Sequence, residues 1–430
     1  MNIEPTATVN GHIAVPGDKS LSHRAVLLAA VGEGETRISG FGRSEDTEST
    51  IRAVRDLGVR VYESDNETLR VFGAGLRGLT SPQQPIDCGN AGTLMRLLPG
   101  LLVGQEGRFE LTGDESLRSR PMERVAEPLR LMGASVETDE GHAPIAIAGG
   151  ALKPTTYELP VASAQVKSAI LLAGLYAEGG DTTVEEPLPT RDHTENLLAQ
   201  AGVTVKRTRS SVTVSPAERL ELGELELPGD FSSAAPFLVA VTLLAGSELT
   251  VHGVNLNPRR IGLLNVLERM GANITVFNRR RIAGEPAGDL DVRPAEIVGT
   301  TIGAAEVPLL VDELPLFALL AVHARGDSVL RGAEELRAKE TDRIEAVADG
   351  LRKLGGHIRA TPDGFKVRGV PSRLRGGGSI DSRGDHRIAI LGAIAGLVSR
   401  EGVEVEGAEA AAVSFPGFYD LLDSLRGSTT

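Results

Sequence analysis

The sequence has one cysteine, no tryptophan and few other aromatic residues. The single thiol, Cys88, excludes an internal disulfide and a metal site built on paired cysteines. Aromatic residues make up 3% of the chain, which leaves little to stack on nucleic-acid bases. The longest apolar run, residues 388–398, is far shorter than the roughly 18–20 residues that span a membrane. These absences together indicate a protein of the reducing cytosol.

Positive charge is also scarce. The 430 residues include 45 Lys and Arg against 58 Asp and Glu, a formal net charge of −13. Nucleic acid and anionic membrane surfaces are therefore not expected as partners. The segment Met1–Pro5 has no basic start followed by an apolar run, so we expect no signal peptide and a cytoplasmic location. The hydrophobic share of 41% is that of a globular protein, and the length suggests two to four domains.

What the sequence does have is an internal repeat of two interleaved patterns. The first is a helix end, a glycine and two strands, with its glycines at Gly58, Gly133, Gly202, Gly271 and Gly355. A glycine directly after a helix is typical of a left-handed C-cap, and the alternation that follows predicts a hairpin. The second pattern is a polar cluster followed by an apolar helical run, and its six runs include residues 25–30, 94–102, 169–175, 236–244, 316–322 and 388–398.

The two patterns predict an α/β protein of six βαβαββ units in two domains, each domain holding three units. The sixth unit lacks the final hairpin, and the strand-like segment Ala7–Val15 could complete it. The first domain, residues 18–229, would then be inserted into the second, residues 1–17 plus 230–430. We expect a hinge near residues 16–18 and 227–231.

All six polar clusters lie at predicted helix N-termini. A helix N-terminus carries about half a positive charge and free N–H groups, so several converging ends would trap a small anion even in an acidic protein. The alternative for each cluster is an ordinary N-cap of Ser, Asp or Asn. The cations beside the caps are what favour a binding site.

The segment Pro16–Arg24 carries the strongest of these signals. Ser20 and Arg24 are four residues apart, on one helical face, and Lys19 lies at the start of the helix. This arrangement favours phosphate or carboxylate binding, although a capped helix with surface cations would have the same sequence. It is not a Walker A loop, because the GxxxxGK[ST] spacing is absent.

Three other segments repeat the combination of a cap and a cation. Gly89–Arg96 is a glycine-permissive turn into a helix, and Thr190–Glu195 places Arg191 at a helix start. Asp385–Arg387 follows a run of three glycines. Each could bind an anion or simply cap a helix. Because no HExxH motif or cluster of His and Asp occurs, we expect no metal.

Two further segments, which together contain charges of both signs, complete the set of candidates. Lys339 and Arg343 would lie one helical turn apart, a repulsive pair unless an anion lies between them, or else a solvated face balanced by Glu340 and Asp342. Asp312-Glu313 lies in a mostly apolar stretch, residues 307–320, so a carboxylate there is either a cap or an acid/base group with a tuned pKa.

As a set, these segments resemble the signatures of the 3-phosphoshikimate 1-carboxyvinyltransferase (EPSP synthase) family. The matching segments follow the family's order: Pro16–Arg24, Gly89–Arg96, Arg118–Met122, Ser163–Gln165, Asp312–Glu313, Arg337–Arg343 and Asp385–Arg387. The resemblance covers about residues 11–420. It implies two domains of three βαβαββ units each, in agreement with the repeat.

The resemblance also implies an activity. The family transfers the enolpyruvyl group of phosphoenolpyruvate to the 5-hydroxyl of shikimate 3-phosphate, by addition and elimination, and releases phosphate. This is a step of the shikimate pathway to chorismate and the aromatic amino acids. A cytoplasmic monomer that needs no cofactor is implied.

Residue roles follow from the same resemblance. The implied catalytic residues are Asp312, which accepts the hydroxyl proton, and Glu340 and Lys19, either of which could deliver a proton to the methylene carbon. The implied shikimate 3-phosphate contacts are Lys19, Ser20, Arg24, Ser163, Ala164, Gln165, Arg191, Asp312 and Lys339. The implied phosphoenolpyruvate contacts are Lys19, Asn90, Gly92, Arg120, Gln165, Arg343 and Arg387. Closure around the hinge would exclude water.

Some positions depart from the better-known family pattern. Ala164 replaces a second serine, and Arg191 lies where other members have a Ser/Tyr pair; both features resemble the glyphosate-tolerant branch. Gly92 is instead the residue of sensitive members. Val413 lies where some members have a lysine that binds phosphoenolpyruvate, and Glu335 where many have Asn.

Two rival functions remain at this stage. UDP-N-acetylglucosamine 1-carboxyvinyltransferase shares the fold but uses a loop cysteine and a Lys-Asn pair near the first helix, where this chain has Lys19-Ser20. A non-catalytic repeat protein that only binds anions would not require Asp312, Glu340 and Lys19 together.

Overall fold

The computed structural model describes residues 1–427 and divides them into two compact units. Of the described residues, unit 1 comprises 1–16, 229–280 and 286–427, and unit 2 comprises 17–228 and 281–285. The chain thus enters unit 2 after Pro16 and leaves it after Pro228, within one residue of the boundaries expected from the repeat. The short segment Arg281–Glu285 belongs to unit 2, which the sequence pattern did not indicate.

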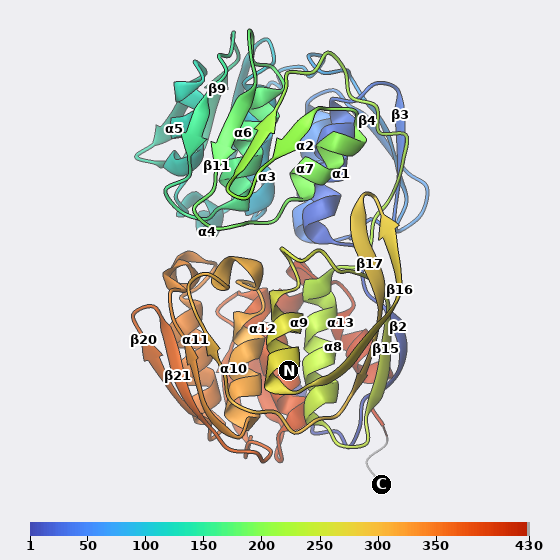
Figure 1. Ribbon diagram of the computed structural model, residues 1–430, viewed down its shortest axis with the longest axis vertical. Coiled ribbons are helices and arrows are strands. Elements are labelled where there is room, and N and C mark those ends of the chain that lie inside the picture. The colour runs from blue at the N-terminus through green and yellow to red at the C-terminus, as the bar shows by residue number, and fades with distance from the viewer. Residues whose placement is uncertain (428–430) are drawn as a thin grey trace. The chain divides into compact units, whose positions relative to one another are not determined.

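Unit 2 contains three four-stranded sheets, one for each repeat (Figure 1). The first repeat consists of β14 (Glu224–Glu226), α1 (Lys19–Ala30), β3 (Glu35–Ser39), α2 (Glu45–Asp56), β4 (Arg60–Glu63) and β5 (Leu69–Phe72). The second consists of β6 (Ile86–Asp87), α3 (Gly92–Leu102), β7 (Arg108–Thr112), α4 (Glu115–Arg118), α5 (Glu123–Leu131), β8 (Ser135–Asp139) and β9 (His142–Ala148). The third consists of β10 (Thr156–Glu158), α6 (Ala164–Gly174), β11 (Thr182–Glu185), α7 (His193–Gln200), β12 (Val205–Arg207) and β13 (Ser211–Val214).

Unit 1 repeats this plan. The fourth repeat consists of β2 (Asn10–Ala14), α8 (Phe231–Leu243), β15 (Glu248–Asn255), α9 (Gly262–Met270), β16 (Asn273–Ile282) and β17 (Glu285–Arg293). The fifth consists of β18 (Thr301–Ile302), the 3₁₀ turn η1 (Val307–Leu309), α10 (Leu314–His323), β19 (Gly326–Leu330), η2 (Glu334–Ala338), α11 (Arg343–Lys353), β20 (His357–Thr361) and β21 (Gly364–Gly369). The sixth consists of β22 (Gly378–Asp381), α12 (His386–Val398), β23 (Val403–Glu406), η3 (Ala408–Val413), α13 (Phe418–Ser424) and β1 (Asn2–Ile3).

Each of the first five repeats joins its first two strands in parallel and closes with an antiparallel hairpin, whereas the sixth has a three-stranded sheet, β1-β23-β22, without that hairpin. In the second repeat, β6 pairs in parallel with β7, and β9 lies antiparallel between β7 and β8. A helix connects the parallel strands, as such a crossover requires. The α/β class and the six βαβαββ units predicted from the sequence are therefore confirmed.

The sixth repeat is completed differently from the sequence prediction. Its missing strand is β1, which pairs antiparallel with β23. The segment expected to complete it, Ala7–Val15, instead forms β2, which pairs in parallel with β15 and opens the fourth repeat. Val9 of this segment forms an isolated bridge to Arg426, and the N–H of Asn10 donates to the carbonyl of Leu425 over 3.0 Å. Apolar alternation identified the strand, but it could not identify the partner, because pairing depends on distant backbone groups.

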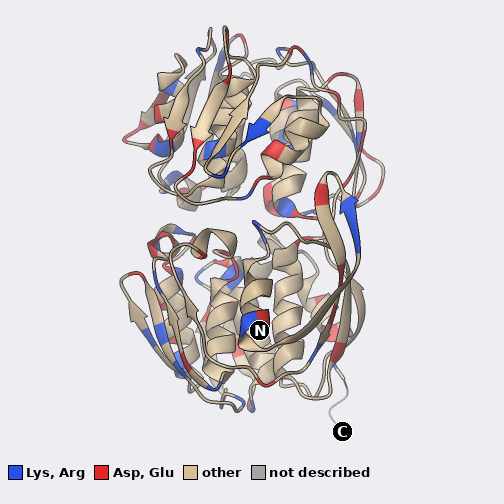
Figure 2. Ribbon diagram, viewed as in Figure 1, with Lys and Arg blue, Asp and Glu red and all other residues tan. Residues whose placement is uncertain are grey.

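The first helix of each repeat forms the core. In unit 1, α8, α10 and α12 pack against one another, and almost every residue of the three is buried. Neither α8 nor α10 contains Lys, Arg, Asp or Glu, so both are uniformly tan in Figure 2. A helix that is apolar all round must lie inside the fold. Among the described residues, no helix is long and apolar enough to cross a membrane.

The five repeat glycines follow the helices that precede the hairpins. Their φ angles lie between +90° and +99°, in the left-handed region, at Gly58, Gly133, Gly202, Gly271 and Gly355. A Cβ is costly at such angles, so glycine is the residue that lets the chain turn from helix to strand. The C-cap prediction is confirmed.

We predict that Gly202→Ala destabilises the protein by about 1–2 kcal/mol, because its φ of +90° strains a side chain although no atom lies within 4 Å of the added Cβ. Gly150→Ala is the matched control: it has equal space but no positive φ, and it should change the stability by less than about 0.5 kcal/mol. Urea unfolding followed by circular dichroism compares the two. Equal losses would contradict the assignment of a strained turn.

Candidate active site

In unit 2, the helix that carries Lys19 begins at a tight backbone crossing. A Cβ on Gly17 would lie 1.7 Å from the carbonyl oxygen of Gly40, so only glycine fits before the cap. Asp18 then caps α1, and its Oδ1 accepts a hydrogen bond of 3.0 Å from the N–H of Leu21. Lys19 Nζ lies 2.7 Å from Oδ2 of Asp46, on α2. The sequence did not identify Asp46, because nothing in the local pattern links two helices.

Arg24 lies one turn farther along α1, and only 4% of its surface is exposed. Its Nη1 donates to the carbonyl of Ser20 over 2.9 Å, so the two lie on one helical face as predicted. Nε donates to Thr194 over 2.7 Å and Nη2 to Ser168 over 3.1 Å. Burial lowers the pKa of Arg24 to about 10, although the negative charge of Glu195 acts in the opposite direction. Because this pKa is still well above 7, the guanidinium stays charged at neutral pH.

Arg191 lies in the loop before α7 and joins this group. Its Nη1 is 3.5 Å from the hydroxyl oxygen of Ser20. Three of the five N–H groups of Arg24 have protein partners, which leaves two that a ligand could use. The structure thus brings together Ser20, Arg24 and Arg191, three residues that the sequence places in segments about 170 positions apart.

The first turns of α3 and α6 form a second group in unit 2. Gln165 on α6 donates to Thr93 over 3.1 Å and accepts from Nη1 of Arg96 over 2.8 Å. Ser163 caps α6, since its hydroxyl accepts from the N–H of Val166, and Ala164 is the first residue of that helix. Arg96 lies in the predicted segment Gly89–Arg96, but the local sequence gives no sign that it belongs to the site.

Gly92 faces two arginine side chains. A Cβ there would lie 3.2 Å from Nη1 of Arg96 and 3.3 Å from Nη1 of Arg120. Arg120 also donates to Oδ1 of Asn90 over 2.6 Å, while the amide of Asn90 donates to Asp114. The start of α3 therefore combines backbone N–H groups with two buried guanidinium groups, a favourable place for an anion.

In unit 1, Arg343 is the centre of the candidate site. Its guanidinium is 2% exposed and contacts three carboxylates. Nε donates to Asp385 over 2.8 Å, Nη2 donates to Glu340 over 2.6 Å, and Nη1 lies 3.7 Å from Oδ1 of Asp312. Burial alone would lower the pKa of Arg343, but Asp385 and Glu340 outweigh it and raise the pKa.

Two buried N–H positions in this group have no hydrogen-bond partner among the described residues. They are Nη1 of Arg343 and Nε of Arg387, which follows the cap of α12. Buried donors almost always form hydrogen bonds, so these two nitrogens, the first of which has only the 3.7 Å ion pair with Asp312, are positions that an anion could use. Asp385 forms that cap, with its Oδ1 2.8 Å from the N–H of Arg387.

Lys339 lies before helix α11 rather than on it. Its backbone is extended, and α11 begins only at Arg343, where Asp342 caps the N–H groups of Ile344 and Glu345. The expected helical stacking of Lys339 and Arg343 is therefore wrong, because the cap starts the helix later. Burial, together with the charge of Arg343, lowers the pKa of Lys339, although nearby carboxylates, first Asp312, act in the opposite direction.

A buried ion network lies next to Asp312 in the sequence. Glu313 is fully buried, and its Oε1 lies 2.9 Å from Nη1 of Arg260, which in turn reaches Asp230 at 3.1 Å. Ser232 donates to Glu313 and accepts from Arg260. The network ties the N-termini of α8 and α10 together. The sequence could not separate Asp312 from Glu313, but the structure does, since only Asp312 approaches Arg343.

The structure thus places the predicted residues in two sets. In unit 2 they are Lys19, Ser20, Arg24, Asn90, Gly92, Arg120, Ser163, Ala164, Gln165 and Arg191. In unit 1 they are Asp312, Lys339, Glu340, Arg343 and Arg387. Within the part of the chain that the structure describes, no group of His, Cys, Asp or Glu is arranged to hold a metal.

A model of the family described as EPSP synthase (3-phosphoshikimate 1-carboxyvinyltransferase) matches residues 3–422. The chain belongs to the EPSP synthase family. It is 48% identical over 422 residues to the 3-phosphoshikimate 1-carboxyvinyltransferase of Alkalilimnicola ehrlichii, which covers 98% of this chain and 94% of that relative. The corresponding protein of Desulforudis audaxviator is 47% identical over 428 residues, with 99% of each chain covered.

Solved structures agree with this membership of the EPSP synthase family. The EPSP synthase of Acinetobacter baumannii matches with a TM-score of 0.89 and 41% identity, covering 99% of this chain and 97% of that one. The enolpyruvyl transferase NikO of Streptomyces tendae matches with a TM-score of 0.80 at 19% identity, over 99% of this chain and 96% of that one. At that identity the second match shows the fold alone.

We predict that Arg260→Met or Glu313→Leu alone destabilises this EPSP synthase family member by about 3–5 kcal/mol, because each leaves a buried charge without its main partner. The double variant should lose less stability than the sum of the two single variants, since Arg260 and Glu313 are removed together, although Asp230 still loses its ion pair with Arg260. Urea unfolding measures the coupling. Arg269→Ala, at an exposed pair with Glu306, is the control and should cost less than about 1 kcal/mol. Additive losses in the double variant would contradict the prediction.

Proposed function

We propose that this chain is a 3-phosphoshikimate 1-carboxyvinyltransferase, which transfers the enolpyruvyl group of phosphoenolpyruvate to the 5-hydroxyl of shikimate 3-phosphate. The family membership supports the reaction. The observation in this structure that carries the proposal is the pair of buried arginine nitrogens, Nη1 of Arg343 and Nε of Arg387, that form no hydrogen bond within the described chain. Phosphoenolpyruvate has a carboxylate and a phosphate, which are the acceptors such donors need.

The proposed chemistry begins with addition. The 5-hydroxyl oxygen bonds to C2 of phosphoenolpyruvate, Asp312 accepts the hydroxyl proton, and a proton is delivered to C3. Glu340 and Lys19 are the candidate donors. The tetrahedral intermediate then loses a proton from C3 and expels phosphate, which restores the carbon–carbon double bond.

Arg343 explains why Asp312 and Glu340 can serve this chemistry. Both carboxylates contact the same buried guanidinium, at 3.7 Å and 2.6 Å. The fixed positive charge orients both groups and offsets negative charge that arrives with the substrate. Unit 2 would supply the groups for the phosphate of shikimate 3-phosphate, with Ser20, Ser163, Gln165 and Arg191 in that role. Arg191 would take the place of the Ser/Tyr pair that many family members have.

The buried thiol argues against the sister reaction on UDP-N-acetylglucosamine. That reaction uses a loop cysteine, whereas Cys88 is fully buried between β6 and α3. Burial, with a smaller contribution from Asp87, raises the pKa of the Cys88 thiol well above its usual range, so no thiolate is available. The cytoplasmic location, the monomeric state and the hinge near residues 16–18 and 227–231 stay predictions from the sequence.

The first experiment is phosphate release with phosphoenolpyruvate and either shikimate 3-phosphate or UDP-N-acetylglucosamine. We expect release with shikimate 3-phosphate only, and a loss of at least a hundredfold in kcat for Asp312→Asn with both substrates still bound. Release with the nucleotide sugar alone would assign the sister reaction. Binding of both ligands without release would favour the non-catalytic repeat protein, and undiminished turnover by Asp312→Asn would refute its catalytic role.

The lowered pKa of Lys339 predicts a pH dependence. Because the amine loses its charge at a lower pH than an ordinary lysine, kcat/KM for shikimate 3-phosphate should fall as the pH rises through that lowered pKa. Lys339→Arg stays charged, so the alkaline decline should move to higher pH. Lys206→Arg, at an exposed lysine of β12, is the control and should leave the profile unchanged. Identical profiles for wild type and Lys339→Arg would exclude Lys339 as the titrating group.

A further inference from the structure

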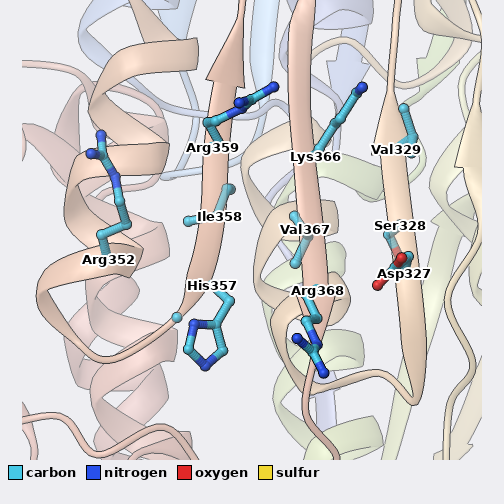
Figure 3. Close-up of a pocket in the computed structure, with 11 residues that line it drawn as sticks. Asp327, Ser328, Val329, Arg352, His357, Ile358, Arg359, Lys366, Val367 and Arg368 are labelled. Atoms are coloured by element: carbon cyan, nitrogen blue, oxygen red, sulfur yellow. The ribbon is translucent and has the colours of Figure 1, made fainter.

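The fifth repeat carries a hollow of about 460 Å³ on its sheet that the proposed reaction does not use (Figure 3). Its lining includes four basic side chains on two neighbouring strands: His357, Arg359, Lys366 and Arg368. We call these four residues the basic face. All four are exposed, and Asp327 is the one carboxylate among the described residues that line the hollow.

Strand register places the basic face in two rows. Arg359 of β20 lies opposite Lys366 of β21, and His357 lies opposite Arg368. Neighbouring strands lie about 5 Å apart, and alternate residues of one strand about 7 Å apart. The four side chains therefore leave the backbone at the corners of a rectangle of about 5 by 7 Å. Figure 3 shows Arg359 and Lys366 on adjacent strands at one end of the hollow, with His357 and Arg368 at the other.

Three of these side chains, Arg359, Lys366 and Arg368, lack an ion-pair partner within the described chain. Cations directly opposite one another on a sheet are destabilising. The same three side chains form no side-chain hydrogen bond among the described residues either. Some exposed arginines elsewhere pair with a glutamate, such as Arg70, and others do not, such as Arg37. Asp327 of β19 lies opposite Arg368 on its other side. Lys366 instead has Arg359 opposite it on one side and Val329 on the other, so no cross-strand carboxylate offsets its repulsion from Arg359.

Protection of a sheet edge does not account for the basic face. Charged residues on edge strands prevent pairing with other molecules, and β20 is an edge strand in the order β18-β19-β21-β20. That role covers His357 and Arg359. It does not cover Lys366 and Arg368, because β21 lies between β19 and β20 and has no free edge.

The repeat architecture does not impose the basic face either. In the second repeat, β7, β9 and β8 correspond to β19, β21 and β20. The row equivalent to Val329, Lys366 and Arg359 there holds Glu110, Ala146 and Glu137. The same frame thus carries an acidic row in one repeat and a basic row in another.

We propose that the basic face binds a small polyanion, a molecule with two or more phosphate groups. A volume near 460 Å³ is in the range of small-molecule sites. Four donors at 5 by 7 Å spacing match a chain of phosphates better than one ion, since each phosphate can meet its own cation. Because the face is open to solvent, binding weakens as salt rises.

The test is isothermal titration calorimetry of the full chain with tripolyphosphate, adenosine triphosphate and orthophosphate. Lys366→Ser/Arg368→Ser removes the cations of β21. Arg37→Ser/Arg108→Ser, at exposed arginines of β3 and β7 without ion pairs, is the matched control. The wild type and both variants share the proposed active site, so any phosphate bound there contributes equally to all three titrations. A difference in affinity between them therefore reports on the basic face.

We expect tripolyphosphate affinity to fall at least tenfold in the Lys366/Arg368 variant and to stay unchanged in the control. Orthophosphate should bind more weakly than tripolyphosphate, and tighter binding of adenosine triphosphate would identify a nucleotide as the source of the phosphates. The Lys366/Arg368 variant should unfold at the same temperature as wild type or higher, and phosphate release should not change.

Equal tripolyphosphate affinity in wild type and the Lys366/Arg368 variant would overturn the proposal. So would equal losses in both variants, which would indicate a general effect of charge. Light scattering tests whether a second copy of the chain occupies the basic face instead. If the wild type is a dimer and the Lys366/Arg368 variant is not, the face is a dimer interface and the proposal is wrong. Failure of these tests leaves the proposed transferase reaction untouched, because no residue of the basic face belongs to it.

Discussion

A guanidinium can be buried only if its charge is matched, and Arg343 meets this condition with Asp385, Glu340 and Asp312. The rest of the unit 1 site depends on this interaction. Asp385 is also the cap of α12, and Arg343 is the first residue of α11, so one ion pair holds two helix N-termini together. Removing either charge would leave the other buried and unmatched, at a cost of about 3–5 kcal/mol.

Other polar side chains also link the N-termini of neighbouring helices within each unit. Arg260 joins the starts of α8 and α10 through Asp230 and Glu313. In unit 2, Gln165 joins the starts of α3 and α6, and Arg24 reaches from α1 to Ser168 on α6. Helix N-termini that share polar side chains present their free N–H groups together. An acidic chain can therefore hold anionic substrates without a surface that is basic overall.

The repeats show how one frame accepts different functions. The first five share one strand order, the sixth lacks the closing hairpin, and the first helix is buried in each. The residues at the helix starts and on the outer faces of the sheets are not needed for that core. They vary freely, which is why one repeat can carry Lys19 and Arg24, another Asp312, and the sheet of the fifth repeat a basic face.

The sequence by itself determined the six repeats, the five hairpins and the segments that carry the site, because apolar periodicity, left-handed glycines and N-caps are local signals. It did not determine which strand completes the sixth repeat, since β1 and β2 pair with strands more than 200 residues away. Nor did it reveal Asp46, Arg96 or Arg260, or the difference in role between Asp312 and Glu313. Those assignments depend on distances across the fold, which only packing of the helices decides.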